Sequence, residues 1–304
     1  MSIFDSYVIV DWSSSNKPNT DKDSIWYCHI IWEDDEIVIR NIKNPPTRHE
    51  AFNEIRELLI QCKNKNYRTL VGFDFSYGYP TGFSKHLGLE QENKWLSIWR
   101  YIDSRIIDNV NNKNNRFEVA KEINHQLSGA NYPFWGCPRS QTSENLTSTK
   151  AKIPSHLEID ELRITEIRNN RAQSAWKLFY PGSVGSQVLT GIPKLLNLYE
   201  DKELRQYSVV WPFETGLKYM NKDQLENKLI VHAEIYPSII DIEIDINEPI
   251  DKAQVRELAY HFAQLDKDNK LGELFEGSDD LTIEERKIIE DEEGWILGIT
   301  DKNN

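Results

Sequence analysis

The chain is short of cysteine, and the few cysteines it has are poorly placed for cross-links. Its 304 residues include three cysteines, which are widely spaced and odd in number. Disulfide frameworks and zinc sites use paired or closely spaced cysteines. We therefore expect Cys28, Cys62 and Cys137 to be packed thiols that form neither a disulfide scaffold nor a zinc site.

Long apolar runs are also missing. No stretch approaches the roughly 20 apolar residues that a membrane-spanning helix needs. The N-terminal segment MSIFDSYVIVDW has no basic region, and its apolar run is too short for a signal peptide. These absences predict a cytoplasmic protein with no membrane partner.

Positive charge is in the minority. The chain has 36 Lys and Arg against 49 Asp and Glu, a formal net charge of −13. Such a protein is a poor non-specific nucleic-acid binder, because phosphate contacts need clustered Lys and Arg. A local basic groove is still compatible with this balance, and part of the acidity lies in residues 279–293.

Several familiar catalytic motifs are absent. The seven histidines show no HExxH or other paired metal spacing, and no Gly-x-Ser-x-Gly nucleophile elbow occurs. The loop 182–187 (GSVGSQ) lacks the lysine of a Walker A motif. Asp74-Phe75-Ser76 lacks the glycine that an actin-like ATPase would need after its second phosphate-binding aspartate, which weakens a kinase interpretation.

What is present is typical of a globular α/β protein. Hydrophobic residues make up 39% of the chain and charged residues 28%, which is not a disordered composition. The length fits one elaborated domain, and we take residues 1–304 as a single domain. No internal repeat is visible.

The first 75 residues predict the order β-β-β-α-β. Residues 6–11, 24–32 and 36–42 read as three strands of a meander. Thr47 suits a helix N-cap, and Glu50 three residues later completes a capping-box pattern. Apolar spacing predicts a helix over 48–63, and the run 69–75 (TLVGFDF) reads as a buried strand.

The rest of the chain divides into an insertion and a return to the sheet. Residues 76–228 have a loose pattern, and we expect them to form a large, mostly helical and loop insertion that covers the core. Residues 229–235 (LIVHAEI) return to a strand. Asp251 then opens an amphipathic helix, and the tail segment EEGWILGI reads as a last strand or turn.

Four acids occupy recurrent places in this pattern. Asp11, Asp74 and Glu234 each end an apolar strand, and Asp251 begins the last long helix. Ligands of open α/β sheets gather outside the carboxyl ends of strands, so we expect these four acids to meet. Mg²⁺ and Mn²⁺ prefer oxygen ligands, and two such ions about 4 Å apart can hydrolyse a phosphodiester. Taken singly, an acid at a strand end often only caps a turn.

The order of strands and acids resembles the RNase H-like superfamily, which includes the RuvC-like resolvases. The chain also resembles the uncharacterised domain-of-unknown-function family numbered 429 and its relatives, which are often labelled cobalamin or molybdopterin-guanine-dinucleotide biosynthesis proteins. Nothing in the residues supports corrin or pterin chemistry. The resemblance covers nearly the whole chain and rests on VDWSSS (10–15), VGFDFSYGYPTGF (71–83), GSVGSQVLTGIP (182–193), WPFET (211–215), HAEIYPS (232–238), DKAQVR (251–256) and EEGWILG (292–298).

The resemblance implies the fold and, as an expectation, metal-dependent nuclease activity. On it, Asp11 would bridge two metal ions, Asp74 and Glu234 would each hold one, and Asp251 would complete the second site. RuvC-like enzymes usually carry paired acids on the last helix. This chain has Gln254 three residues after Asp251, which puts one of the two metal sites in doubt.

Other residues are candidates for contacts with substrate. Small hydroxyl side chains directly follow Asp11, a Gly/Ser loop leads into a helix near position 186, and isolated basic residues recur between 116 and 177. The plainer alternative for each is a polar turn, a helix-entry loop or a solvated surface charge. The aromatic groups at Trp135 and Trp211 suit base stacking but more often belong to a core. The substrate-binding candidates are Ser13, Ser14, Arg116, Arg163, Lys177, Ser186 and Gln187.

Three functions are compatible with these residues. The leading hypothesis is Mg²⁺- or Mn²⁺-dependent phosphodiester hydrolysis by a nuclease acting on nucleic acid. The second is a phosphotransferase or phosphohydrolase that acts on a nucleotide or other small molecule, which the acidic net charge and the serines after Asp11 favour. The third is a non-catalytic binding partner in a DNA-processing or defence system. We also expect that the chain could bind a protein partner or form a homo-oligomer.

Overall fold

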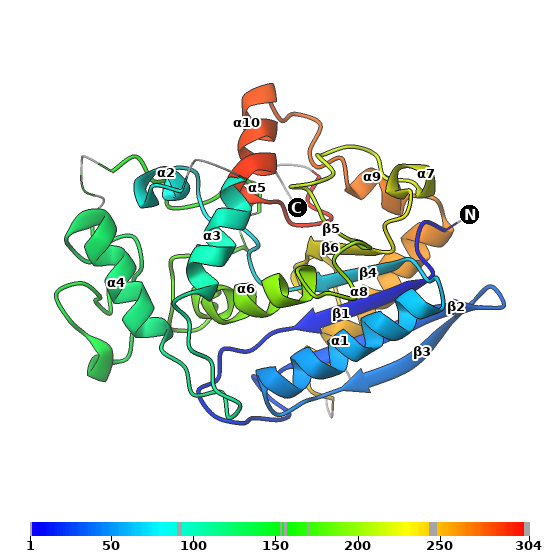
Figure 1. Cartoon of the computed structure of the whole chain (residues 1–304), viewed down its shortest axis with the longest axis horizontal. Helices are drawn as coiled ribbons and strands as arrows, with labels where there is room; N and C mark the ends of the chain where they lie inside the picture. Colours follow the sequence, from blue (N-terminus) through cyan, green and yellow to red (C-terminus); the bar gives the residue numbers. More distant parts are fainter. Residues whose placement is uncertain are drawn as a thin grey trace.

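A six-stranded mixed sheet forms the centre of the protein (Figure 1). The computed structural model describes residues 2–89, 93–152, 154, 157–169, 171–242 and 248–300. The strands follow the spatial order β3-β2-β1-β4-β6-β5. Their bounds are β1 Ser6–Asp11, β2 Trp26–Glu33, β3 Glu36–Lys43, β4 Thr69–Phe73, β5 Ser208–Val210 and β6 Ile230–Glu234.

The strands of the sheet run in mixed directions. β2 runs antiparallel to both β1 and β3, whereas β4 is parallel to β1 and β6 is parallel to β4 and β5. The protein is therefore an α/β protein with a mixed sheet, as the sequence predicts, and its sheet order is consistent with the RNase H-like fold. Because β1, β4 and β6 are parallel neighbours, their carboxyl ends lie along one edge.

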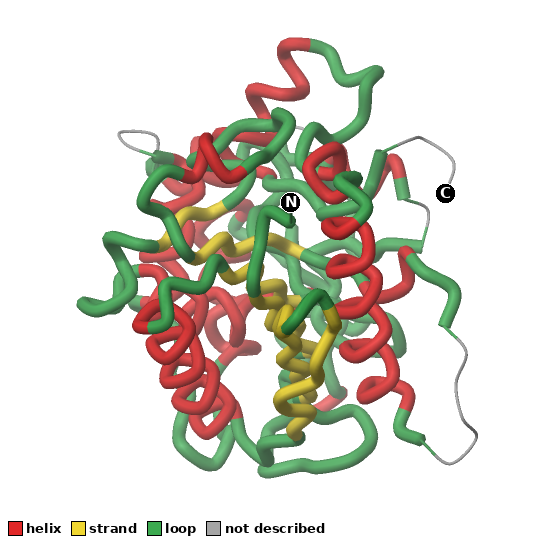
Figure 2. Tube along the Cα trace, turned by 90° about the vertical axis from the view of Figure 1, so that its right-hand side faces the viewer, coloured by secondary structure: helices red, strands yellow, loops and turns green. Residues whose placement is uncertain are grey.

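Helices cover both faces of the sheet, and Figure 2 shows the strands between two helical layers. One face packs against α1 (Arg48–Asn64) and α6 (Gly185–Tyr199), with Val8, Val10 and Phe73 in this core. The other packs against α8 (Ile250–Lys267), with Tyr7 and Ile9 in that core. Alternate residues of β1 thus enter opposite cores, as the pleat of a strand requires.

The remaining helices are short or belong to the excursion between β4 and β5. The longest of them, α3 and α4, lie beside α6 on one side of the molecule (Figure 1). Their bounds are α2 Phe83–Leu87, α3 Lys94–Asp103, α4 Arg116–Ser128, η1 Arg139–Gln141, α5 Ile164–Arg168, α7 Lys222–Leu225, η2 Pro237–Ile239, α9 Leu271–Leu274, α10 Ile283–Ile288 and η3 Ile289–Glu293.

The predicted strands and long helices agree with the structure to within a few residues. Thr47 is the N-cap of α1, and its side chain accepts the Glu50 N–H. β5 is the main difference, because residues 208–210 fall inside the predicted insertion 76–228. The chain therefore leaves the sheet after Phe73 and rejoins it at Ser208. The sequence does not predict β5, because a strand of three residues is too short to show a periodic pattern.

Two expectations about composition can be compared with the structure. Cys28, Cys62 and Cys137 are buried free thiols. Within the described ranges, no helix combines the length and the apolar character that crossing a membrane requires. In the tail segment 292–299, which is predicted as a strand or turn, η3 ends at Glu293, Ile296 forms a bridge to Glu234, and residues 297–298 form a turn.

Candidate carboxylate site

Asp11 and Asp74 end neighbouring parallel strands at the same level. Val10 of β1 pairs with Phe73 of β4, so the residues that follow them in each chain segment stand side by side. The Asp74 N–H donates to the Val10 carbonyl (3.2 Å), and the Trp12 N–H donates to Asp74 Oδ1 (2.7 Å). These backbone contacts fix both acids at the carboxyl edge of the sheet.

Asp251 reaches the same place from the other side of the sheet. It lies in the first turn of α8, the helix that packs beneath β1 and β2. Its carboxylate accepts the Asp23 N–H at 3.1 Å. The negative charge of Asp251 raises the pKa of both Asp11 and Asp74, so the three carboxyl groups form one electrostatic cluster.

The cluster disfavours full ionisation. Burial, followed by repulsion from Asp74 and Asp251, raises the pKa of Asp11 well above its usual range. Burial raises the pKa of Asp74 to about 7, although the Trp12 N–H and a hydrogen bond with Asp11 oppose the shift. That hydrogen bond raises the pKa of Asp11 and lowers that of Asp74. Asp11 and Asp74 therefore titrate as a coupled pair, and their burial and repulsion favour a protonated form of the pair.

No described residue forms an ion pair with these three acids, although the charge of Lys22 partly offsets that of Asp251. The ion pairs found among the described residues include none for Asp11, Asp74 or Asp251. Burial also raises the pKa of Asp251. Close carboxylates without a counter-ion repel one another, and they titrate together until a proton or a cation relieves the repulsion.

Glu234 lies at the same edge but faces another environment. It pairs with Phe73, one level before Asp74, and the Phe73 side chain packs in the core of the α1 and α6 face. Because side chains alternate along a strand, Glu234 points to that face, whereas Asp74 stands on the alternate position. The structure therefore brings three of the four predicted acids together and separates Glu234 from them.

A buried arginine holds Glu234. Arg163 Nη2 donates to Glu234 Oε1 (2.6 Å), and Nη1 donates to Oε2 (2.8 Å), which also accepts the Tyr77 N–H (2.9 Å). Arg163 Nε donates to Glu166 Oε1, and the two remaining donors go to Ser76 Oγ and the Glu293 carbonyl. All five guanidinium donors are used, so Arg163 ties Glu234 to the insertion and the tail.

The metal ligands implied by the sequence are only partly arranged in this structure. In the part of the chain that the structure describes, no three His, Cys, Asp or Glu side chains are placed so that they could hold a metal ion. The Asp11 and Asp74 carboxyls use one another as hydrogen-bond partners, and both oxygens of Glu234 are engaged by Arg163. Asp11, Asp74 and Asp251 form one electrostatic cluster, but their oxygens are not placed in this structure to bind one ion together.

Two adjoining cavities open at this edge. A cavity of about 660 Å³ is lined by Asp11, Asp251 and Ser13–Ser15. A second, of about 390 Å³, is lined by Asp74, Glu234 and Arg163, together with Gln254 from α8. Both are lined by Gly182, Ser183 and Gln187, so the loop before α6 separates the two lobes of one cleft.

The serines after Asp11 line the larger lobe and are held by a second buried arginine. Arg48 Nη1 donates to the carbonyls of Ser13 and Ser15 (3.0 and 2.8 Å). Its Nε and Nη2 bind the buried Asp108 carboxylate, and Nη2 also donates to the Asn112 carbonyl. The sequence alone does not indicate that Arg48 is buried beside the cleft, because Arg48 is one of several polar residues in the first turn of α1.

The other predicted substrate residues are distributed around the cleft. Arg116 lines the larger lobe and donates from Nε to Ser186 Oγ (2.9 Å). Gln187 lines both lobes and donates to the Trp12 carbonyl. Lys177 lines neither lobe, and its Nζ donates to Gln173 Oε1 and the Pro181 carbonyl.

The two tryptophans considered for base stacking do not line the cleft. Trp211 is fully buried, and its Nε1 donates to the Phe275 carbonyl in the core beside α8. Trp135 is partly buried against the opposite core, with Lys177 Nζ 6.0 Å from its ring centroid. Two aromatic residues that the sequence reading passed over, Phe179 and Tyr180, line the larger lobe instead.

Comparison with known proteins adds no relative. No family model, no curated protein and no solved structure matches this chain.

Proposed function

We propose that this protein hydrolyses phosphodiester bonds of nucleic acid with the help of a divalent cation held by Asp11, Asp74 and Asp251. The single observation that carries the proposal is the cluster of these three carboxyl groups at the carboxyl edge of the sheet, with raised pKa values and without a cationic partner among the described residues. Glu234, by contrast, is paired with Arg163, whereas Asp74 and Asp251 accept backbone N–H groups and form no ion pair among the described residues.

The donor set has the chemistry that a hard cation prefers, although the three carboxylates would have to rearrange to bind one ion together. Mg²⁺ and Mn²⁺ take carboxylate oxygens and retain water in their coordination shell. When bound, such an ion lowers the pKa of a coordinated water and offsets negative charge on a phosphoryl oxygen. Asp11 and Asp74 would both have to be ionised to bind it. Cation affinity should therefore rise with pH as this coupled pair, in which both pKa values are raised, loses its protons.

The proposal assigns Glu234 a positioning role rather than the metal-binding role that the family resemblance implies. Its two oxygens are engaged by Arg163, and the Tyr77 N–H holds one of them. Through this pair, the end of β6 is fixed to Ser76 just after Asp74. Glu234 and Arg163 would keep the β4 and β6 ends in place while the three aspartates carry the charge.

No family model matches this chain, so the resemblance to the family numbered 429 bears on the fold and not on the proposed activity. The sheet order agrees with the RNase H-like fold that this resemblance implies. The family itself has no settled biochemical role, so its contribution is limited to the placement of the acids on the fold. The labels that refer to cobalamin and molybdopterin chemistry contribute nothing to the proposal.

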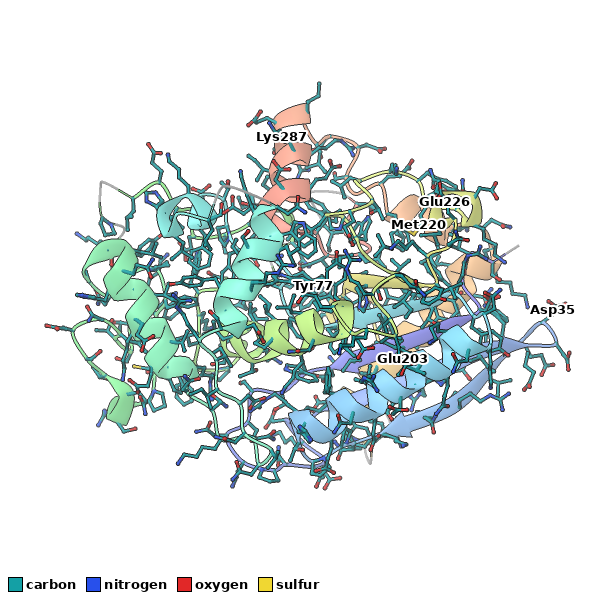
Figure 3. The ribbon with its side chains drawn as sticks, viewed as in Figure 1. Asp35, Tyr77, Glu203, Met220, Glu226 and Lys287 are labelled. Atoms are coloured by element: carbon teal, nitrogen blue, oxygen red, sulfur yellow. The ribbon has the colours of Figure 1, made fainter. Side chains whose placement is uncertain are left out.

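The experiment is a cleavage assay with matched Asp→Asn variants. Single-stranded and duplex DNA and RNA are incubated with the protein in Mn²⁺ or Mg²⁺, and products are resolved on denaturing gels. We expect cleavage to fall on the order of 10³-fold in Asp74→Asn and Asp11→Asn. Asp35→Asn is the control, because Asp35 lies at the exposed tip of the β2–β3 hairpin (Figure 3).

The result that would contradict the proposal is equally concrete. Intact substrates across the whole panel would oppose it, as would cleavage that Asp74→Asn leaves unchanged. Asn can still accept the Trp12 N–H that Asp74 accepts, so loss of activity in this variant would report the loss of the charge rather than of the fold.

A second candidate is hydrolysis of a nucleotide in place of a polymer. The observation that favours it is the size of the two lobes, about 660 and 390 Å³, which falls in the range of small-molecule sites. Thermal stabilisation by a nucleotide, lost in Asp74→Asn, would support this candidate. Phosphate release from the same nucleotide would show turnover.

A further inference from the structure

We propose that the larger lobe of the cleft holds one unpaired nucleotide unit, with Phe179 and Tyr180 stacking on the base and Arg116 binding the phosphate. The inference rests on the proposed function and deepens it, because it names the class of substrate that the cleft selects. All three residues line the cavity of about 660 Å³ that Asp11 and Asp251 also line.

The aromatic pair is exposed where most aromatic residues of this protein are not. Phe179 is 39% exposed and Tyr180 45% exposed, and Tyr219 is the third exposed aromatic residue in the described ranges. The rings of Phe179 and Tyr180 lie 5.1 Å apart between centroids, at an angle of 60°. Exposed aromatic faces beside a catalytic cleft are the platforms on which proteins stack unpaired bases.

The backbone at Tyr180 is held in an unfavourable conformation. Its φ is +80°, in the left-handed region that bulky residues rarely adopt. Neighbouring hydrogen bonds hold the segment there, since the Ser183 N–H donates to the Tyr180 carbonyl and the Leu178 N–H to the Trp135 carbonyl. Strain that the surrounding structure maintains is concentrated at functional sites, and here it places a tyrosine ring at the cleft.

Arg116 is a buried cation that forms no ion pair with a described residue, although the charge of Asp108 acts on it. The residue is 8% exposed, and no ion pair with it occurs in the described part of the chain. Nε donates to Ser186, and Nη1 donates to the side chains of Asn16 and Asn114. Nη2 has no partner among the described residues, whereas Arg48 and Arg163 each use all five donors and bind carboxylates.

An anionic ligand would satisfy this guanidinium. Burial, and then the charge of Arg48, lower the pKa of Arg116 to about 10, so the side chain stays charged at neutral pH. A phosphate oxygen supplies the charge and the acceptor that Nη2 lacks. Among the described residues, Arg116 is the only Lys or Arg that lines this lobe. The lobe therefore offers one phosphate subsite, and the described lining has no row of cations that would match a long duplex backbone.

The choice of an unpaired nucleotide follows from the two contacts together. A base can lie on Phe179 or Tyr180 only when it is free of its partner strand, because paired bases hide their faces in the helical stack. The phosphate on Arg116 would then lie in the same lobe as Asp11 and Asp251. The cleft should therefore favour single-stranded nucleic acid or a free nucleotide end over duplex.

The test is a binding measurement that does not need catalysis. Fluorescence anisotropy with a labelled tetrathymidylate, in EDTA and in an Asp74→Asn background, measures affinity without cleavage. An otherwise identical oligonucleotide with abasic sites measures the part that comes from bases. We expect the parent to bind the intact strand about tenfold more tightly than the abasic strand and more tightly than duplex.

The variants separate the two contacts. Phe179→Ala and Tyr180→Gly should bind intact and abasic strands alike, and glycine also tolerates the positive φ at position 180. Arg116→Met should weaken both strands and lower the salt dependence of binding by about one unit of slope. Tyr219→Ala, the matched exposed aromatic outside the cleft, should behave as the parent.

The outcomes are distinguishable from failure of the proposed function. Equal binding of intact and abasic strands by the parent would overturn the inference, as would variants of Phe179 and Tyr180 that keep the parental preference. If the preference for bases is present but the wild-type protein cleaves nothing with Mn²⁺, the inference stands and only the hydrolytic proposal falls. Each variant's thermal unfolding shows whether a loss of binding comes from a loss of fold.

Discussion

Two groups of buried or half-buried carboxylates lie near the same edge of the sheet, and they differ in whether they form an ion pair. Glu234 and Glu166 share Arg163, which donates to both. Asp11, Asp74 and Asp251 form no ion pair with any described residue, and the pKa values of all three are raised. Burying an acid is tolerable when its charge is paired and costly when it is not. The first group therefore serves the fold, and the second is suited to binding something that the chain itself does not supply.

The position of Tyr77 shows how near the two groups are. Tyr77 lies at the centre of the molecule (Figure 3), and its N–H donates to Glu234. It follows Asp74 by only three residues, so the chain passes from one group to the other within a single turn. Because the two groups lie so close together, a substitution that changes the charge of Asp74 can be compared directly with one that changes the charge of Arg163.

The largest expected effect comes from breaking the paired group. Arg163→Met leaves Glu234 and Glu166 buried without a partner, which costs about 3–5 kcal/mol of the free energy of unfolding. Urea unfolding followed by circular dichroism measures the loss. Arg171→Met is the matched control, since Arg171 lines the same lobe but is exposed and makes one long contact with the Ser238 carbonyl (3.4 Å).

A loss below about 1 kcal/mol in Arg163→Met, or an equal loss in both variants, would contradict this part of the account. It would mean that the Arg163 pair contributes no more than an exposed charge does.

A smaller effect of opposite sign is expected from the unpaired group. Asp74→Asn removes one negative charge from the cluster and still accepts the Trp12 N–H, so the metal-free protein should become more stable by roughly 1 kcal/mol at pH 8. Thermal or urea unfolding in EDTA measures the change, with Asp35→Asn as control. A destabilised Asp74→Asn protein would show that the ionised carboxylate contributes to the fold.

The pH dependence sharpens the same comparison. Asp74 has a pKa of about 7 in the folded protein, above its ordinary value of 3.8, so the folded state binds more protons than the unfolded state between these limits. The contribution of Asp74 to stability therefore falls as the pH rises from about 4 to about 7. In EDTA, the wild type should lose stability across this window more steeply than Asp74→Asn. Parallel curves would contradict the raised pKa.

The sequence predicts which acids reach the edge of the sheet, but it does not predict which of them face one another. Apolar runs ending in Asp11, Asp74 and Glu234 identify three strand ends, and these strands are found as predicted. The separation of Glu234 depends on register. It pairs with Phe73 while Asp74 lies one residue further on, and one residue reverses the direction of a side chain.

The partners of these acids are even less visible in the sequence. Arg163 is 71 residues away from Glu234 along the chain and lies in a region with no clear periodicity. Tyr180 gives no sign of its positive φ, because neither glycine nor asparagine marks the position. The sheet could be predicted because strands have a period, whereas these contacts depend on how the long excursion between β4 and β5 folds over the sheet.

The most direct test of the central claim is an anomalous-scattering map from crystals soaked in Mn²⁺ at pH 8, above the pKa of Asp74. The account predicts density for at least one ion between Asp11, Asp74 and Asp251, and no ion at Glu234 while Arg163 remains bound to it. A map without an ion at the three aspartates would contradict the account, as would an ion held by Glu234 in place of Arg163.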